Sequence, residues 1–298
     1  MTPLGAPQRA VLVHGGLDHP ATHGRLASLR AAARATLDAT DHVAAVVAGL
    51  SRLEADPQFN AGLGMSLDEH GDASADAGLV DGRRSRSAAV AALRNALHAS
   101  KVAAALLAED LGPVLLVGEG AERFALRAGF PPSDVVTPER RRHLRSVVGG
   151  SATGIGSDTV GSIAVRNDSI AAGGSSGGIT GKRVGRVGDA AINGAGMYAD
   201  AEVGVLCCGS GEVAIDYNLA SRVAFMCSDA PSVVSALTSI LTLVRERPNG
   251  EIGVMLYQRR ARRFLIAHNS RHLQACVIST KGEVVLDPPA FEVAVAEC

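Results

Sequence analysis

The sequence predicts an α+β fold in which two β-sheets pack face to face and helices cover their outer faces. Short apolar runs typical of buried strands occur near both ends of the chain, with amphipathic segments of helical spacing between them. The chain has 298 residues, of which 47% are hydrophobic and only 20% are charged. Such a chain can bury a large core, so we expect a single domain over residues 1–298.

The first third of the chain predicts alternating strands and helices. Residues 10–13 form an apolar run that ends at a glycine pair, as a buried strand does. Apolar side chains then recur on one helical face over residues 26–37 and again over 43–53, where Asp41 can cap the first turn. Further strands are expected at residues 87–93 and 114–117, and further helices at residues 101–110 and 119–128.

Residues 131–158 have a different composition. This segment starts with two prolines, carries three consecutive arginines at 140–142 and ends in a stretch rich in glycine and serine. It has too little apolar surface to be held in place by burial, so we expect an exposed linker. A chain can be cut in a segment of this kind.

The second half of the chain begins and ends with predicted strands. Strands are expected at residues 159–165 and 170–174, with a turn at Asn167 and Asp168, and another at 203–207. Two long amphipathic segments, 212–226 and 231–245, predict helices. The remaining strands are expected at residues 252–257, 263–267, 275–279 and 284–286.

Charge and cysteine usage narrow the classes of function. The 29 basic and 30 acidic side chains nearly cancel, which argues against nucleic acid or a membrane as a partner and favours a small-molecule or short-peptide substrate. The nine histidines show no zinc-binding spacing. Five cysteines without regular spacing, and no export signal in residues 1–8, indicate a cytoplasmic protein.

Thr159 is the candidate nucleophile. It lies between the expected linker and an apolar run, in the segment 156–161 (GSDTVG). If the chain is cleaved between Asp158 and Thr159, the threonine gains a free α-amine beside its own hydroxyl. An α-amine titrates at roughly 7.7–8.0 and can accept the hydroxyl proton near neutral pH. One residue would then supply both nucleophile and base.

Several motifs occur in one order along the chain: HGG at 14–16, FNAGLG at 59–64, LVGEGA at 116–121, DTVG at 158–161 and GRVGD at 185–189. With these motifs the sequence resembles, over nearly its whole length, the asparaginase-2 family of N-terminal nucleophile hydrolases. This family contains plant-type L-asparaginase/isoaspartyl peptidases, threonine aspartases and glycosylasparaginases. The resemblance implies a four-layer αββα sandwich. It also implies a precursor that cleaves itself into an α subunit (1–158) and a β subunit (159–298), and a homodimer of the cleaved units.

The resemblance also implies roles for polar residues after Thr159. Arg186 offers a planar fork for a substrate α-carboxylate, and Asp189 complements the α-ammonium group. Gly209 and Gly211 complete the substrate site. Ser176 stands where the family usually has a threonine that hydrogen-bonds the nucleophile.

The position expected to stabilise the oxyanion departs from the family pattern. The family places a threonine or serine hydroxyl there together with the next glycine N–H, whereas this chain has Cys208 followed by Gly209. A thiol is a weak donor, so Gly209 is expected to carry more of the stabilisation. We therefore expect an enzyme that is slow with asparagine or adapted to another substrate.

The segment 53–63 resembles the family loop whose backbone carbonyls hold a sodium ion. The implied role of this ion is structural, and no cofactor is expected in catalysis. Within the same segment, Asn60 is implied to lie near the nucleophile and to help position it. The carbonyls that map onto the sodium ligands belong to Leu53, Glu54, Asp56, Phe59, Ala61 and Leu63.

The sequence therefore predicts an autocatalytically processed amidohydrolase that releases L-aspartate from asparagine or from β-aspartyl peptides. Three alternatives stay open. A threonine aspartase-like endopeptidase fits Asp158 and the serine pair at 175–176, although that subfamily has glutamine in place of Asp189. A glycosylasparaginase fits the segment 194–200, although the chain has no tryptophan. A non-catalytic relative would keep the head-group site and act as a binding protein.

Overall fold

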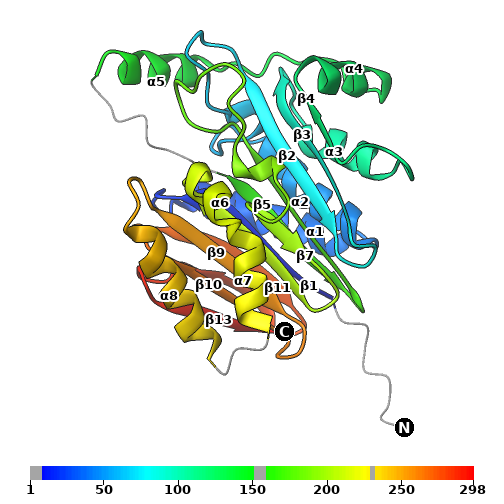
Figure 1. Cartoon of the computed structure of the whole chain (residues 1–298), viewed down its shortest axis with the longest axis vertical. Coiled ribbons are helices and arrows are strands. Elements are labelled where there is room, and N and C mark those ends of the chain that lie inside the picture. The colour runs from blue at the N-terminus through cyan, green and yellow to red at the C-terminus, as the bar shows by residue number, and fades with distance from the viewer. Residues whose placement is uncertain (1–8, 151–158, 229–231) are drawn as a thin grey trace.

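The structure, a computed structural model, describes residues 9–150, 159–228 and 232–298. It confirms the α+β class: these residues form helices and two sheets (Figure 1). The eight-stranded sheet has the order β12 (Gly282–Leu286), β11 (Leu273–Ser279), β1 (Arg9–Leu17), β5 (Val160–Arg166), β6 (Ser169–Ser176), β2 (Ser74–Asp81), β3 (Arg86–Arg94) and β4 (Leu115–Val117). The five-stranded sheet has the order β13 (Val293–Glu297), β10 (Arg263–His268), β9 (Ile252–Gln258), β8 (Val203–Gly209) and β7 (Met197–Ala199).

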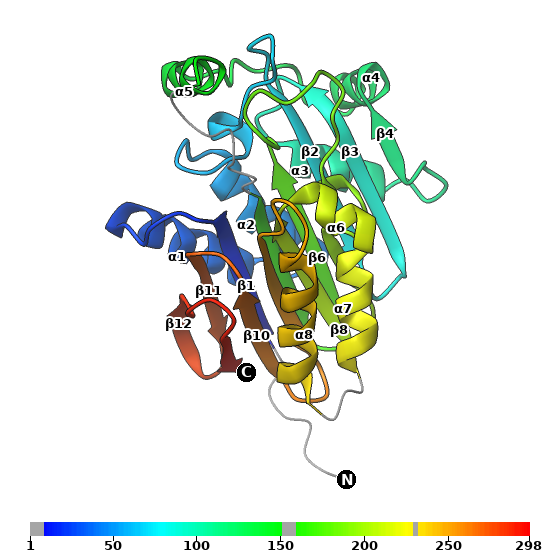
Figure 2. The ribbon, with the colours of Figure 1, turned by 60° about the vertical axis from the view of Figure 1, so that its left-hand side comes forward.

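Helices contact each sheet on the side away from the other sheet (Figures 1 and 2). Strands β2, β3, β5 and β6 of the eight-stranded sheet pack against α2 and α3, and β1 packs against α1. Helices α7 and α8 pack against β8 and β9 of the five-stranded sheet. The bounds are α1 (His23–Asp38), α2 (His42–Glu54), α3 (Ala99–Leu107), α4 (Glu119–Arg127), α5 (Pro138–Val148), α6 (Gly211–Tyr217), α7 (Leu219–Ser228) and α8 (Val233–Arg245).

Buried apolar side chains form three large clusters that correspond to this arrangement. The first cluster lies between the helices and the eight-stranded sheet and includes Leu50 of α2. The second lies between the two sheets, with Ile163 of β5 and Leu206 of β8. The third lies between the five-stranded sheet and its helices and includes Leu237 of α8. Because side chains alternate along a strand, each sheet contributes to two clusters.

The expected elements near the N-terminus are confirmed, with small shifts in their ends. Asp41 caps α2 as predicted, since its carboxylate accepts the N–H groups of Val43 and Ala44, both at 2.9 Å. The turn at Asn167 is also present between β5 and β6, with φ of 51° at that residue.

The exposed linker expected over residues 131–158 contains a helix that was not predicted, α5, in its middle part. Thr137 caps this helix by accepting the N–H of Arg140, and Pro138 occupies the first turn, where its missing N–H is not needed. Glu139 and Arg142 add an ion pair at 2.6 Å. No residue of α5 is buried, so local capping defines it. Residues 151–158 lie outside the described residues.

The helix expected at residues 212–226 is two helices instead. Asn218 separates α6 from α7 because its backbone adopts the left-handed conformation, with φ of 46° and ψ of 52°. The N–H groups of Ala220 and Ser221 then bond to the carbonyls of Ala195 and Gly194. This connection ties the start of α7 to the loop beside Asp189.

Two further points concern the described part of the chain. No helix within residues 9–150, 159–228 and 232–298 combines the length and the apolar character that crossing a membrane requires. All five cysteines are free thiols and all are buried.

Candidate active site

Three neighbouring strands bring Thr159, Ser176 and Asp76 into one row. Between β5 and β6, Val160 pairs with Ser175, and between β6 and β2, Ser176 pairs with Asp76. Thr159 directly precedes Val160, so it lies beside Ser176 at the end of this row. The Val160 side chain packs toward the helices. Because side chains alternate along a strand, its two neighbours in the chain, Thr159 and Gly161, both face the second sheet.

Strand β8 of the second sheet crosses this face, and the Cys208 side chain lies in the layer between the two sheets. A Cβ placed on Gly204 would contact Ile163 at 3.1 Å, and one placed on Gly161 would lie 2.9 Å from Leu206. Moving two residues forward on β8 therefore corresponds to moving two residues back on β5. One further step of this progression would bring Cys208 toward Thr159.

The Thr159 side chain is buried, and its polar atom is unused. Thr159 is 3% exposed, and its Oγ1 has no hydrogen-bond partner among the described residues. Its methyl group lies 3.5 Å from where a Cβ on Gly174 would stand. A buried hydroxyl without a partner is unfavourable for folding, so such a group calls for an explanation in function.

The loop after Ser176 is held by a group of buried hydrogen bonds. The Gly178 N–H donates to Ser176 Oγ at 3.0 Å, and Asn60 Nδ2 donates to the Gly178 carbonyl at 2.7 Å. The Asn60 carbonyl accepts the Gly177 N–H, and Lys182 Nζ donates to the Gly177 carbonyl at 2.8 Å. Asn60 therefore acts on the segment that follows Ser176.

Arg186 is engaged in an ion pair that the sequence did not predict. Its Nε and Nη2 donate to Glu212 Oε1 at 3.0 and 2.8 Å. Its Nη1 points the other way, since a Cβ on Gly178 or Gly188 would lie 2.9 or 2.7 Å from it. The side chain of Arg186 is 13% exposed and that of Glu212 is 60% exposed. The guanidinium is thus oriented by Glu212 and presents its Nη1 to the interior.

Asp189 is a buried carboxylate with an unpartnered oxygen. It is 3% exposed, and its Oδ2 has no hydrogen-bond partner among the described residues. Burial raises the pKa of Asp189 from 3.8 to about 7, although the nearby Arg186 lowers it. A Cβ on Gly211 would lie 3.0 Å from both Asp189 Oδ1 and Arg186 Nη2. Gly211 therefore leaves room where the two charged groups approach each other.

Gly209 ends β8 in a conformation that favours glycine. Its φ is 116°, and a Cβ there would lie only 2.2 Å from the Glu251 carbonyl oxygen. Cys208 is fully buried, and a Cβ on Gly253 would lie 3.0 Å from its Sγ. His14, which pairs with Gly161, is also fully buried, and burial lowers its pKa to about 3. The imidazole is therefore neutral at neutral pH.

The segment implied to hold sodium has the features of a carbonyl-lined cradle. A Cβ on Gly62 would lie 2.1 Å from the Glu54 carbonyl oxygen, and one on Gly64 would lie 2.1 Å from that of Phe59. Each of these oxygens packs closely against a glycine, and backbone carbonyls are suitable ligands for a hard cation. The expected ion would be held by the carbonyls of the 53–63 segment and would stabilise that loop.

Gly62→Ala is expected to destabilise the protein by roughly 2–4 kcal/mol, because the new methyl group would meet two carbonyl oxygens at a φ of 54°. Urea unfolding measures this loss. Gly129→Ala is the matched control: its φ is 86°, but no atom lies within 4 Å of the added methyl group. Equal losses in the two variants would mean that the cradle itself is not constrained.

Several buried polar residues around the site were not assigned a role from the sequence. Asp76 and Lys182 are 1% and 3% exposed and lie beside Arg186. Ser175 does not face Thr159, because its hydroxyl donates to Glu54 Oε1 at 2.7 Å. Nothing in the sequence around Asp76 indicates where its carboxylate points. Asp158 lies outside the described residues.

Comparison with known proteins shows the family to which the chain is similar. Residues 13–286 match the protein family described as asparaginase. The chain is 35% identical to an isoaspartyl peptidase/L-asparaginase of Rattus norvegicus over 261 residues, which cover 84% of this chain and 76% of the rat protein. It is 34% identical to a plant-type L-asparaginase of Pyrococcus abyssi over 235 residues, which cover 71% of this chain and 77% of the archaeal protein.

Proposed function

Because the chain belongs to the asparaginase family, we propose that it is an N-terminal threonine hydrolase that releases L-aspartate from L-asparagine and from β-aspartyl dipeptides. The observation that carries this proposal is the buried, unpartnered Thr159 hydroxyl at the start of β5. After cleavage of the Asp158–Thr159 bond, the α-amine of Thr159 would stand beside that hydroxyl.

The proposed reaction proceeds through an acyl ester. The α-amine takes the Thr159 hydroxyl proton while Oγ1 attacks the side-chain amide carbon of the substrate. When the tetrahedral intermediate collapses, the carbon–nitrogen bond breaks, and the protonated α-amine gives its proton to the departing ammonia or amine. Water then attacks the ester with the same amine as base, which frees aspartate and restores Thr159.

The head group of the substrate would bind between Arg186 and Asp189. The inward Nη1 of Arg186 suits the α-carboxylate, and the unpartnered Oδ2 of Asp189 suits the α-ammonium group. This pairing favours a free amino-acid head group over the interior of a protein chain. This observation separates our proposal from a threonine aspartase-like endopeptidase. The lack of tryptophan argues against a glycosylasparaginase.

The oxyanion would be stabilised by the groups at the end of β8. The Gly209 N–H is the main donor in this proposal, with Ser176 beside the nucleophile. Cys208 would contribute only a weak S–H donor.

Cys208→Thr is expected to raise kcat for L-asparagine by about threefold to thirtyfold, because a hydroxyl is a stronger donor to the developing oxyanion. Initial rates of ammonia release measure the change. Cys207→Thr is the control, since the neighbouring side chain packs on the opposite face of β8, against the helices. A kcat for Cys208→Thr that is unchanged or reduced would exclude position 208 from oxyanion stabilisation.

The decisive experiment combines mass spectrometry with an assay of products. Two fragments that meet at Asp158 and Thr159, together with release of ammonia and aspartate from L-asparagine or β-aspartyl-leucine, would agree with the proposal. An intact chain that binds L-aspartate without any turnover would support a non-catalytic binding protein instead.

The same proposal covers the architecture of the mature protein. We propose that residues 1–298 form a single domain, a four-layer αββα sandwich of the N-terminal nucleophile hydrolase type, with subunits 1–158 and 159–298. We also propose a cytoplasmic location and a homodimer of cleaved units. Size-exclusion chromatography with light scattering tests the assembly.

A further inference from the structure

Asp76 is a buried carboxylate that the proposed reaction does not use directly. It lies on β2, pairs with Ser176 across the sheet and is 1% exposed. Each of its oxygens accepts one backbone N–H: Oδ1 from Ala92 at 2.9 Å and Oδ2 from Gly188 at 2.8 Å. The carboxylate therefore joins β3 to the loop that carries Arg186 and Asp189.

The connection to β3 occurs at an irregularity of the sheet. The pairing passes from Ala75 with Leu93 to Ala77 with Val90, which leaves an extra residue of β3 opposite Asp76. Ala92, within this bulge, has a φ of 48°, a left-handed conformation that is strained for alanine. The hydrogen bond from Ala92 to Asp76 stabilises this conformation, so Asp76 and the bulge support each other.

The connection to the loop brings Asp76 near Arg186. A Cβ on Gly188 would lie 2.7 Å from Arg186 Nη1 and 3.4 Å from Asp76 Oδ2, so both groups lie beside Gly188. Burial raises the pKa of Asp76, while Lys182 and Arg186 lower it electrostatically. Asp76 thus acts on the inward end of Arg186, and Glu212 acts on its outward end.

We propose that Asp76 is a positioning residue that fixes the Arg186 Nη1 group and the Gly188–Asp189 backbone in the geometry required by a substrate α-carboxylate. This inference rests on the proposed function, because it concerns the same head-group site. Without Asp76, the Gly188 N–H would lose its hydrogen-bond acceptor. Arg186 would also lose the negative charge near its Nη1 group. The substrate would then have to order this loop on binding, which weakens affinity.

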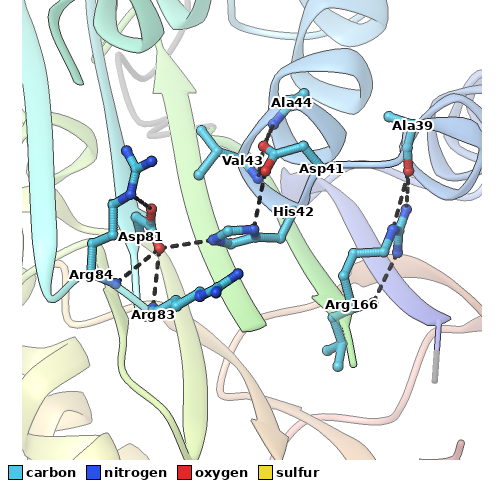
Figure 3. A network of polar contacts seen from close by, with 10 residues as sticks. Ala39, Asp41, His42, Val43, Ala44, Asp81, Arg83, Arg84 and Arg166 are labelled. Atoms are coloured by element: carbon cyan, nitrogen blue, oxygen red, sulfur yellow. Dashed lines mark hydrogen bonds and ion pairs between the residues drawn. The ribbon is translucent and has the colours of Figure 1, made fainter. Parts of the chain in front are cut away.

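Asp81 provides a matched control on the same strand (Figure 3). It is 2% exposed and also accepts two backbone N–H groups, those of Arg83 and Arg84, together with a bond at 2.8 Å to His42. It lies five residues along β2 from Asp76, about 17 Å away. A purely structural effect of losing a buried carboxylate would appear in both variants.

The test compares Asp76→Asn with Asp81→Asn on two substrates. L-Asparagine carries the α-carboxylate, whereas L-aspartic diamide has a neutral amide in its place. We expect Asp76→Asn to raise KM for L-asparagine by about tenfold or more, with kcat changed less than about threefold, and to affect the diamide much less. Asp81→Asn should leave the ratio of the KM values for the two substrates as in the wild type.

If Asp76→Asn raised KM equally for both substrates, the inference would be overturned. It would also be overturned if Asp81→Asn raised KM selectively for L-asparagine. If Asp76→Asn does not fold, Asp76→Glu replaces it in the test, because glutamate keeps the charge but displaces both oxygens. The deciding quantity is again KM for L-asparagine relative to KM for the diamide. Absence of turnover in the wild type would instead refute the proposed function. Calorimetric binding of L-aspartate, expected to be weaker in Asp76→Asn than in Asp81→Asn, would then still decide the role of Asp76.

Discussion

Thr159→Ala is expected to abolish both chain cleavage and hydrolysis. Alanine removes the nucleophilic oxygen and leaves no other buried, unpartnered hydroxyl facing the second sheet at this end of β5 among the described residues. Loss of a covalent nucleophile lowers kcat by about 10⁴-fold or more in comparable enzymes. Mass spectrometry should find an intact chain, and no ammonia should be released from L-asparagine above the background.

Thr159→Ser is the control for this prediction. Serine keeps the hydroxyl and the α-amine but lacks the methyl group that packs near Gly174. It should therefore still cleave and still turn over substrate, with a reduced rate because the side chain is less restricted. Retained hydrolysis in Thr159→Ala would contradict the mechanism, since no other group is proposed to form the acyl ester.

Asp189→Asn is expected to lower kcat/KM for L-asparagine by about 10²–10³-fold. Asparagine cannot supply the negative charge that the α-ammonium group requires, and loss of one member of a buried charge pair costs about 2–5 kcal/mol. In the wild type, Asp189 must be ionised to bind substrate. With its pKa near 7, kcat/KM should rise as the pH increases through about 7. A second rise is expected near the pKa of the Thr159 α-amine, roughly 7.7–8.0.

The same substitution is expected to stabilise the fold at neutral and alkaline pH. The pKa of Asp189 is about 7 in the folded protein and 3.8 as its ordinary value, so the folded state loses stability as the pH rises from about 4 to about 7. That difference corresponds to at most roughly 4 kcal/mol. Denaturant unfolding should give Asp189→Asn a higher free energy of unfolding than the wild type at pH 8 but not at pH 4. A pH-independent difference would contradict the assigned pKa.

The sequence predicts best those features that depend on local patterns. Most strands were recognised from short apolar runs. Thr159 was proposed as the nucleophile from its place between a polar segment and such a run. Strand β2 was missed because its sequence, SADAGLVD, contains mostly small or acidic residues that do not favour strands by themselves. Its strand conformation is imposed by the neighbours β3 and β6, which lie elsewhere in the sequence.

Long-range contacts account for what the sequence could not supply at the candidate site. The pairing of Arg186 with Glu212 spans 26 residues, and the bond from Gly188 to Asp76 spans 112. Neither contact follows from spacing along the chain, because each depends on how the two sheets and their loops come together. Helix α5 is a different case, since its cap at Thr137 and Pro138 could have been recognised locally.

The strand order of the large sheet has a consequence for a chain cut before Thr159. Strand β1 comes before the cut and pairs with β5 and β11, which both come after the cut. Strand β2 also comes before the cut and pairs with β6, which comes after it. The two pieces are therefore interleaved within one continuous hydrogen-bonded ladder. Neither piece can dissociate without breaking the sheet, so the cleaved protein should unfold as one cooperative unit. In the folded state, the new amine at Thr159 stands at the start of β5, which is held between β1 and β6.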